Sequence, residues 1–296
     1  MRVLIYKPYD DPNDDFTYED MDGNATVIVR AADYAAYLGI VVCNSMGNEM
    51  QTSPPSIVSP PDGDSVIAVG AVDSTGKIAY FSSNGPTSNG RIKPDVVAMG
   101  VDVLAAVSYI YSYDDSSYSY TGGTSFSCPL TAGVCALILS VHPELTPMQV
   151  REALRMTADR KDKPDNVYGW GLINAYEAAL YYGMIMSNKP ELKFEDGKIV
   201  ISTFIISKNQ VNKDSIKMYY SLDGTDNYSH SGFELLERID ETGSGKFETV
   251  INGTLEGNTL RFYIIASDSD KEISSPYNAP VHYFYFNNET KQLEIF

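Results

Sequence analysis

The chain has 296 residues, of which 22 are basic and 39 acidic, and its formal net charge is −17 at pH 7. Nucleic-acid binding requires clustered lysine and arginine, so this composition excludes a nucleic-acid partner and indicates a well-solvated surface. No apolar run reaches membrane-spanning length, and residues 1–9 carry too short an apolar core for a signal peptide.

The first half of the chain predicts helices that alternate with short apolar strands. Residues 26–38 carry apolar side chains at helical spacing, and Gly39 suits the position that follows a helix. Further apolar stretches predict strands at residues 40–43, 65–72, 95–98 and 103–106. A helix followed at once by an apolar strand predicts α/β architecture around a parallel sheet.

Two acidic regions contain carboxylates of the kind that bind calcium. Asp10 to Gly23 predicts a surface loop, and its last residues only hint at a calcium loop, because Ala31 stands where a bidentate glutamate is needed. Later acidic loop tips are expected to be solvated, at Asp223, Asp226, Asp268 and Asp270. We therefore expect no cofactor and no bound metal.

Residues 122–133, with the sequence GGTSFSCPLTAG, are the most informative stretch. Two glycines allow the backbone to approach a ligand closely, and the apolar residues 134–139 predict a buried helix. Ser125 lies at the start of this helix, where free N–H groups and the helix dipole favour negative charge. Acyl transfer needs such a field when the attacked carbonyl becomes an oxyanion, so Ser125 is a candidate nucleophile.

Helix signals continue after this stretch. Thr146-Pro147-Met148-Gln149 is a capping box that predicts a helix to about Thr157, and Asn174 can cap a last helix ending near Tyr182. Before the Ser125 helix, the Tyr-rich segment 108–121 predicts either a cover over a substrate cleft or a plain surface hairpin. Both interpretations of this segment stay open.

Alternating apolar and polar residues dominate the C-terminal part. Asp196-Gly197 and Asp223-Gly224 are turn signals between such runs. The pattern predicts a β-sandwich of the fibronectin-III or jelly-roll type over residues 189–296, after a linker at 183–188 and a first domain at 1–182. Its clearest expected strands are residues 198–205, 216–221, 260–266 and 282–286.

The three cysteines, Cys43, Cys128 and Cys135, give no disulfide framework. Cys128 and Cys135 lie seven residues apart on one predicted helix, about 10 Å along its axis, which is too far to bridge. All three are expected to act as small buried apolar residues.

Several segments together resemble the subtilisin-like serine peptidases. Residues 123–133 match the family's nucleophile motif, and residues 44–49 (NSMGNE) resemble its oxyanion-asparagine loop. Residues 65–72, 81–86 and 91–98 resemble consecutive core segments, so that the resemblance covers residues 5–182. It implies part of a subtilisin-like parallel sheet with helices on both faces and an endopeptidase that acts on polypeptides.

The resemblance also implies individual roles. Ser125 would be the nucleophile, and Asn48 would donate its side-chain amide to the oxyanion beside the Ser125 backbone N–H. Five residues would border the substrate: Ser45, Met46, Gly47, Gly123 and Thr124. Val3 to Ile5 align with the family's substrate-pairing strand.

In the family order, an aspartate and a histidine segment precede the oxyanion loop, but the 47 residues before Asn48 contain no histidine. We therefore expect a chain that begins about halfway through the catalytic domain. His142 follows Ser125 by 17 residues, about 25 Å along a continuous helix, which is beyond hydrogen-bond reach. His230 and His282 lie in the second domain, where packing or surface roles are expected.

Two functions follow from this pattern. The first is a serine endopeptidase that is inactive and poorly folded alone unless the missing N-terminal half of the domain is supplied as a partner. The second is a non-catalytic binding scaffold that uses the β-sandwich. The full-length parent is expected to be extracytoplasmic or secreted, although this chain carries no export signal.

Overall fold

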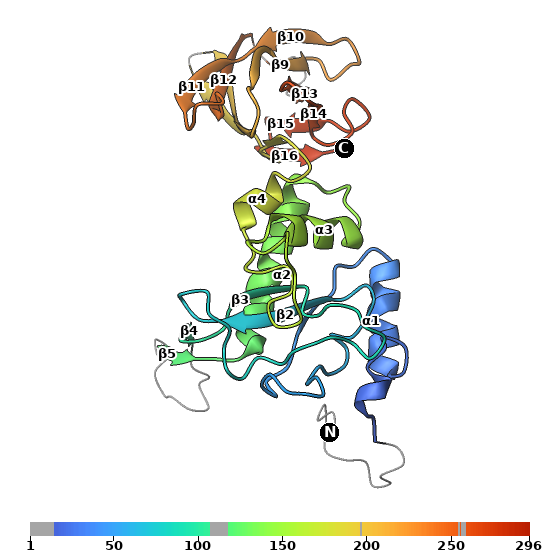
Figure 1. Ribbon diagram of the computed structural model, residues 1–296. Helices are drawn as coiled ribbons and strands as arrows, with labels where there is room; N and C mark the ends of the chain where they lie inside the picture. Colours follow the sequence, from blue (N-terminus) through green and yellow to red (C-terminus); the bar gives the residue numbers. More distant parts are fainter. Residues whose placement is uncertain (1–14, 107–117, 196, 254, 256–258) are drawn as a thin grey trace. The chain divides into compact units, whose positions relative to one another are not determined.

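The computed structural model describes residues 15–106, 118–195, 197–253, 255 and 259–296 (Figure 1). The chain divides into two compact units. The N-terminal unit comprises residues 1–139 and 144–181, and the C-terminal unit comprises residues 140–143 and 182–296. The expected substrate-pairing strand at Val3–Ile5 and most of the Tyr-rich segment lie outside the described residues.

A three-stranded parallel sheet forms the centre of the N-terminal unit. Its order is β1 (Cys43–Ser45), β2 (Ile67–Val72) and β3 (Val96–Met99). Cys43 pairs with Ile67, and every residue of β2 is buried. The predicted α/β class with a parallel sheet is thus confirmed, although irregular segments rather than helices connect these three strands.

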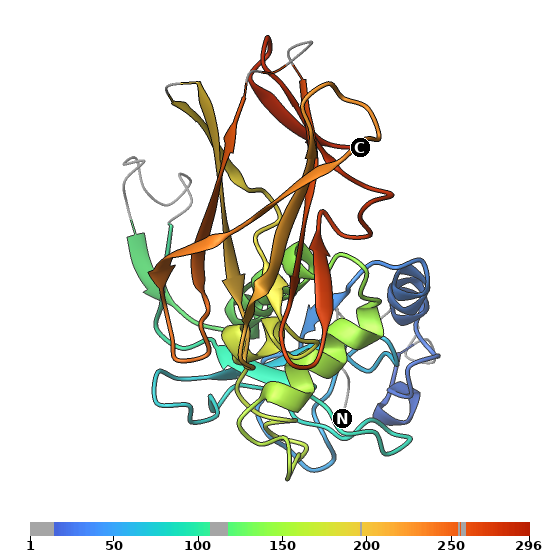
Figure 2. The same ribbon diagram turned by 90° about the horizontal axis from the view of Figure 1, so that it is seen from above.

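The described part of the Tyr-rich segment forms a hairpin. β4 (Val103–Ala106) pairs antiparallel with β5 (Tyr118–Thr121), whose residues are mostly exposed. Figures 1 and 2 show this hairpin on the side of the N-terminal unit opposite to α1 (Val27–Tyr37).

The capping residues expected from the sequence begin three of the helices. Side-chain oxygens of Thr26, Thr146 and Asn174 accept backbone N–H bonds at the starts of α1, α3 and α4. α3 spans Pro147–Thr157 as predicted, whereas α4 spans only Ala175–Ala179 because Leu180 already leaves helical geometry. A 3₁₀ turn spans Tyr18–Asp20.

α2 (Thr124–Val141) is an 18-residue apolar helix with Pro129 inside it. By length and composition alone, with a mean hydropathy of 1.7, this helix could cross a membrane. Core helices of soluble proteins have the same properties, and Cys135 and Ile138 of α2 are buried in this unit. Leu130 and Leu137, in contrast, are 47% and 58% exposed.

A buried ion network ties the sheet to α3. Lys93 Nζ lies 2.9 Å from Asp95 Oδ2 and 2.8 Å from the Val66 carbonyl oxygen, with the Asp95 side chain fully buried. The other Asp95 oxygen accepts from Arg155, whose guanidinium lies 4.0 Å above the Trp170 ring. Trp170 therefore packs against the Arg155 guanidinium, which bonds to the buried Asp95 carboxylate.

Gly169 is expected to tolerate no side chain. Its φ is +61°, and a Cβ there would lie 2.2 Å from the Pro94 carbonyl oxygen. Gly76 has a similar φ of +79° with nothing within 4 Å of a Cβ. We predict that Gly76→Ala costs only the backbone strain of about 1 kcal/mol, whereas Gly169→Ala costs ~1–3 kcal/mol more through the clash. Urea unfolding of both variants checks this, and equal losses would contradict it.

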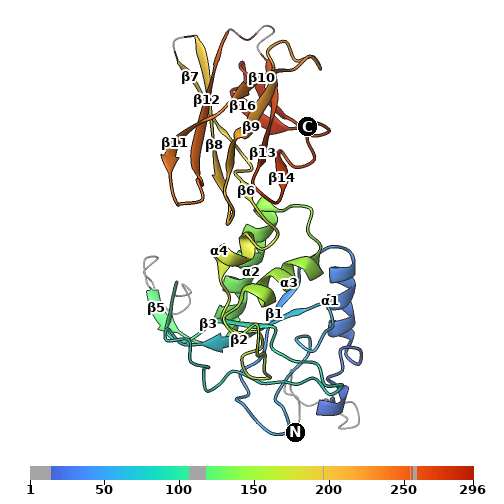
Figure 3. The same cartoon turned by 45° about the horizontal axis from the view of Figure 1, so that its top comes forward.

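The C-terminal unit consists of two antiparallel sheets that share one apolar core (Figure 3). One sheet has the order β10-β9-β13-β15-β16 with β14 beside β13, and the other has the order β11-β12-β8-β6 with β7 beside β8. The strand bounds are β6 Ile185–Met186, β7 Glu191–Glu195, β8 Lys198–Ile206, β9 Asn212–Ser221, β10 Ser229–Gly232, β11 Glu234–Arg238, β12 Gly245–Asn252, β13 Thr259–Ser267, β14 Glu272–Ser275, β15 Phe284–Asn287 and β16 Gln292–Ile295.

The stretch 183–188, predicted as a linker, belongs to this unit instead. β6 pairs with β8, and the side chains of Met184 and Met186 lie in the shared core. Apolar side chains are stabilised by burial, which explains why this segment is packed rather than extended in solvent.

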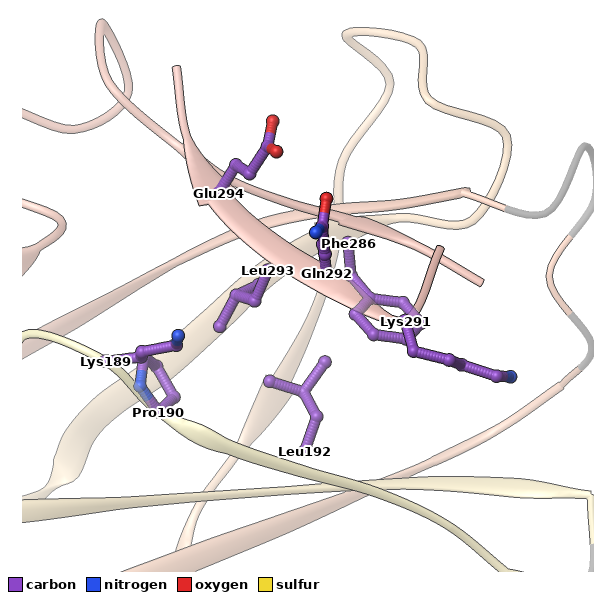
Figure 4. A pocket seen from close by; sticks show the side chains of 8 residues that line it. All are labelled: Lys189, Pro190, Leu192, Phe286, Lys291, Gln292, Leu293 and Glu294. Atoms are coloured by element: carbon purple, nitrogen blue, oxygen red, sulfur yellow. The ribbon is translucent and has the colours of Figure 1, made fainter. Parts of the chain in front are cut away.

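A groove of about 500 Å³ opens beside β7 and β16, the edge strands of the two sheets (Figure 4). Its lining residues are Lys189, Pro190, Leu192, Phe286, Lys291, Gln292, Leu293 and Glu294. None of the site residues predicted from the sequence lines this groove.

Candidate active site

Ser125 is the second residue of α2, and it is exposed. The turn before it is held from two sides, because Gly123 N–H donates to the Gly100 carbonyl at 2.8 Å and Phe126 N–H donates to the Gly123 carbonyl at 3.0 Å. Gly123 has a φ of +142°, which favours glycine, so the two-glycine turn is needed to aim the helix start. The predicted position of Ser125 at a helix N-terminus is confirmed.

Asn48 lies in the loop that follows β1. Gly47 has a φ of +106°, and a Cβ there would lie 2.8 Å from Ser83 Oγ. Ser83 fixes this loop, since its N–H donates to the Gly47 carbonyl at 2.9 Å and its Oγ accepts from Glu49 N–H at 3.0 Å. Ligands in α/β sheets bind outside the carboxyl ends of the strands, which is where this loop lies.

Thr124 fixes the orientation of the Asn48 amide. Its backbone N–H and its hydroxyl both donate to Asn48 Oδ1, each at 3.0 Å, and Gly47 N–H donates to the same hydroxyl oxygen at 3.3 Å. A backbone N–H can only donate, so the amide oxygen must face Thr124. The Asn48 NH₂ group is therefore left to point away from Thr124.

Two N–H donors border the space beside Gly123. A Cβ built on Gly123 would lie 3.6 Å from Asn48 Nδ2 and 3.7 Å from Ser125 N. Because Gly123 has no side chain, both nitrogens lie within van der Waals reach of the same point. Two such donors next to a serine hydroxyl form the arrangement that stabilises an oxyanion in acyl transfer.

The other expected substrate residues differ in their surroundings. Ser45 is half-buried at the end of β1. Met46 was predicted to border the substrate. Its side chain is instead fully buried in a core cluster with Met21, Ile57 and Ala68. The motif gives the position of Met46 along the chain but not the direction of its side chain, which is large and apolar and is therefore buried in the core.

The Thr124 side chain contacts Asn48. Thr124 is 1% exposed, and its hydroxyl donates to Asn48 Oδ1, so its place beside the substrate stays a prediction. Sequence reasoning missed Ser83 altogether. The segment 81–86, already noted as family-like, was the available signal for it.

The three histidines are engaged elsewhere. α2 is continuous to Val141, and His142, which follows it, is 4% exposed with its ring edge-on to Tyr182. His282 Nδ1 lies 3.0 Å from the Tyr277 carbonyl oxygen, and the His230 ring packs beside Tyr219. No hydrogen bond between a histidine and Ser125 occurs in the described part of the chain.

The acidic residues of the C-terminal loop tips have hydrogen-bond or ion-pair partners within the protein. Asp223 Oδ1 accepts from Ser221 and Thr225, and these hydrogen bonds lower the pKa of Asp223 to about 2. Asp268 accepts from the distant Ser207 Oγ at 2.6 Å, and from the backbone N–H groups of Asp270 and Lys271 in its own turn. Residues 15–106, 118–195 and the described remainder hold no group of three His, Cys, Asp or Glu side chains arranged for a metal.

Comparison with known proteins identifies relatives of this site. A model of the subtilase family matches residues 15–171. The serine protease AprX of Bacillus subtilis is 41% identical over 164 residues, which make up 50% of this chain and 37% of AprX. Subtilisin DY of Bacillus licheniformis is 39% identical over 156 residues, 52% of each chain.

Among solved structures, the self-cleaved protease domain of PatA aligns with 54% of this chain and 57% of its own, at 25% identity and a TM-score of 0.43. The chain spans about half or less of the length of the curated relatives described above. The family model covers more than half of the chain and includes both Asn48 and Ser125. The chain belongs to the subtilase family.

Proposed function

We propose that Ser125 is the nucleophile of a peptide-bond hydrolase that forms an acyl-enzyme. The observation that supports this most strongly is the bonding of Thr124 to Asn48 Oδ1, which turns the Asn48 NH₂ away from Thr124 while both Asn48 Nδ2 and Ser125 N stay close to Gly123. In this proposal the serine oxygen attacks the carbonyl carbon, and the carbonyl oxygen becomes negative between those two donors. Water then releases the acyl group.

The proton acceptor for Ser125 is proposed to come from a segment outside residues 1–296. A serine hydroxyl is a weak nucleophile without an adjacent base, and the three histidines of the chain have the other contacts described above. The family resemblance implies that this segment carries a histidine and an aspartate. Among the described strands, β1 is a half-buried edge strand, and parallel sheets are usually covered on both faces, which supports the addition of such a segment there.

The exposed apolar face of α2 supports the same segment as a partner. Leu130 and Leu137 are each about half exposed, although they lie on a helix that otherwise packs into the core. Covering a leucine side chain contributes ~1.5–3 kcal/mol when burial is complete.

By the same family resemblance, we propose an extracytoplasmic location for the full-length parent.

Labelling with a fluorophosphonate tests the proposal. The chain is mixed with the Asp- and His-containing part of AprX, and we expect rapid labelling of Ser125 in the mixture and very slow labelling of the chain alone. Ser125→Ala should abolish labelling. Ser74→Ala, which alters an exposed turn serine, is the matched control and should change nothing.

Two results would contradict the proposal. Equal labelling of the chain alone would show that a base lies within residues 1–296. Absence of labelling in a mixture that binds, as judged by size-exclusion chromatography, would instead favour the non-catalytic scaffold.

A further inference from the structure

Two cysteine sulfurs meet between the central sheet and α2. Cys43 is the first residue of β1, and its Sγ lies 3.7 Å from the Sγ of Cys135 on α2. Cys135 is 3% exposed, whereas Cys43 is half-buried. Cys128 lies two helical turns before Cys135, on the same side of α2. The proposed hydrolysis uses none of these thiols.

We propose that Cys43 and Cys135 are a disulfide-forming pair that, when oxidised, links β1 covalently to α2. A disulfide has an S–S distance of about 2.05 Å, so each sulfur must move by only ~0.8 Å from the observed separation. The bond joins the strand that leads into Asn48 to the helix that carries Ser125. This inference does not depend on whether Ser125 is catalytic.

A low-molecular-weight disulfide, such as oxidised glutathione, is the oxidant that balances the reaction. The Cys43 thiolate, which is the more exposed of the pair, attacks one glutathione sulfur and releases the first reduced glutathione. The Cys135 thiolate then attacks Cys43 Sγ in the mixed disulfide and releases the second. The two protons of the protein thiols end on the two glutathione molecules, and the protein loses two electrons to them.

The rate of this exchange should rise with pH. The contact with the Cys135 thiol and burial together raise the pKa of Cys43. The attacking species is the thiolate, so a raised pKa makes it scarce at neutral pH and more abundant as the pH increases. A mildly alkaline buffer is therefore the condition for the test.

The folded chain and the unfolded chain should form different disulfides. In the folded chain, α2 holds Cys128 and Cys135 about 10 Å apart along the helix axis, which prevents a bond between them. In the unfolded chain, that same pair closes the shortest loop and should form first. The pairing of Cys43 with Cys135 spans 92 residues, so it is favoured only where the fold brings the two sulfurs together.

Peptide mapping distinguishes these outcomes. The full chain is used alone if its near-UV circular dichroism shows a folded state, and otherwise in the mixture with the Asp- and His-containing segment. It is incubated with oxidised glutathione with and without concentrated urea, and free thiols are then alkylated. We expect a cross-linked Cys43–Cys135 peptide with Cys128 alkylated in the folded sample, and mainly Cys128–Cys135 in urea. Cys43→Ser and Cys135→Ser should remove the native cross-link, and Cys128→Ser should keep it.

The proposal is overturned if the folded chain keeps three free thiols, or if it gives the same pairing as the unfolded chain. A second measurement checks the link between strand and helix. Oxidation should raise the melting temperature of the N-terminal unit by about 10 °C, because the bond closes a long loop in the unfolded state. A cross-link that leaves the melting temperature unchanged would refute its stabilising role, and Cys43→Ser should show no shift.

Discussion

Asp95→Asn is expected to destabilise the protein by about 3–5 kcal/mol. Lys93 is 1% exposed, and its ammonium group has the Asp95 carboxylate and the Val66 carbonyl as its partners. Removing the carboxylate charge leaves a buried cation without compensation and also removes the partner of Arg155. The free energy of unfolding, measured by urea titration followed by fluorescence, checks this expectation.

A matched substitution gives the control. Asp64→Asn removes a carboxylate that is 62% exposed and pairs with Arg91 at the surface. Such a pair contributes at most about 1 kcal/mol, so this variant should be almost as stable as the parent. Equal losses in Asp95→Asn and Asp64→Asn would show that burial of the ion network does not govern its contribution.

The same carboxylate predicts how stability changes in acid. Burial alone would raise the pKa of Asp95, but Lys93, Arg155 and Arg151 outweigh it and lower the pKa to about 2, from an ordinary value of 3.8. A lower pKa in the folded state means that ionised Asp95 stabilises the fold above about pH 4, and that this contribution is lost as the pH falls towards 2. Asp95→Asn should lack this part of the acid dependence.

Asn48→Ala should slow acylation of Ser125 by about 10²–10³-fold, the loss already known for the oxyanion asparagine of subtilisin itself. The variant removes the Nδ2 donor but leaves the Ser125 N–H in place. The rate is measured as phosphonylation of Ser125 by a fluorophosphonate, which releases fluoride and develops charge on a phosphoryl oxygen as acylation does on a carbonyl oxygen, in the assembly that contains the Asp- and His-bearing segment. Asn227→Ala changes an exposed asparagine of the C-terminal unit and should have no effect.

Thr124 variants separate positioning from donation. Thr124→Val keeps the backbone N–H bond to Asn48 Oδ1 but removes the hydroxyl bond, so we expect a loss of about tenfold. Thr124→Ser retains the hydroxyl and should recover most of the rate.

If Ser125 in the Asn48→Ala variant reacts at the parent rate, the Asn48 amide is excluded from the oxyanion site.

Local signals predicted the elements around Ser125 well. The nucleophile motif places Ser125 at a helix start because two glycines and an apolar run specify that turn by themselves. Thr26, Thr146 and Asn174 likewise act as N-caps, since capping depends on neighbouring residues only. The α/β class followed from the order of helices and apolar strands.

Contacts between distant segments were not predictable in this way. Sequence reasoning placed Met46 at the substrate, whereas packing buries its side chain, and the bonds between Thr124 and Asn48 were not foreseen. The approach of Cys43 to Cys135 depends on how α2 lies against β1, which the spacing of residues along one helix does not reveal. Met184 and Met186 belong to the second core for the same reason.

The hydrogen bonds between Thr124 and Asn48 have a consequence for inhibitors. They join the loop after β1 to the first residue of α2, so they restrict the movement of the Asn48 amide relative to the Ser125 N–H. If Asn48 and Ser125 N–H bind the oxyanion as proposed, a tetrahedral boronate or phosphonate adduct would meet donors whose positions are fixed before it arrives. Little conformational entropy is lost when a ligand docks in a preorganised recess, which favours tight binding by small transition-state mimics.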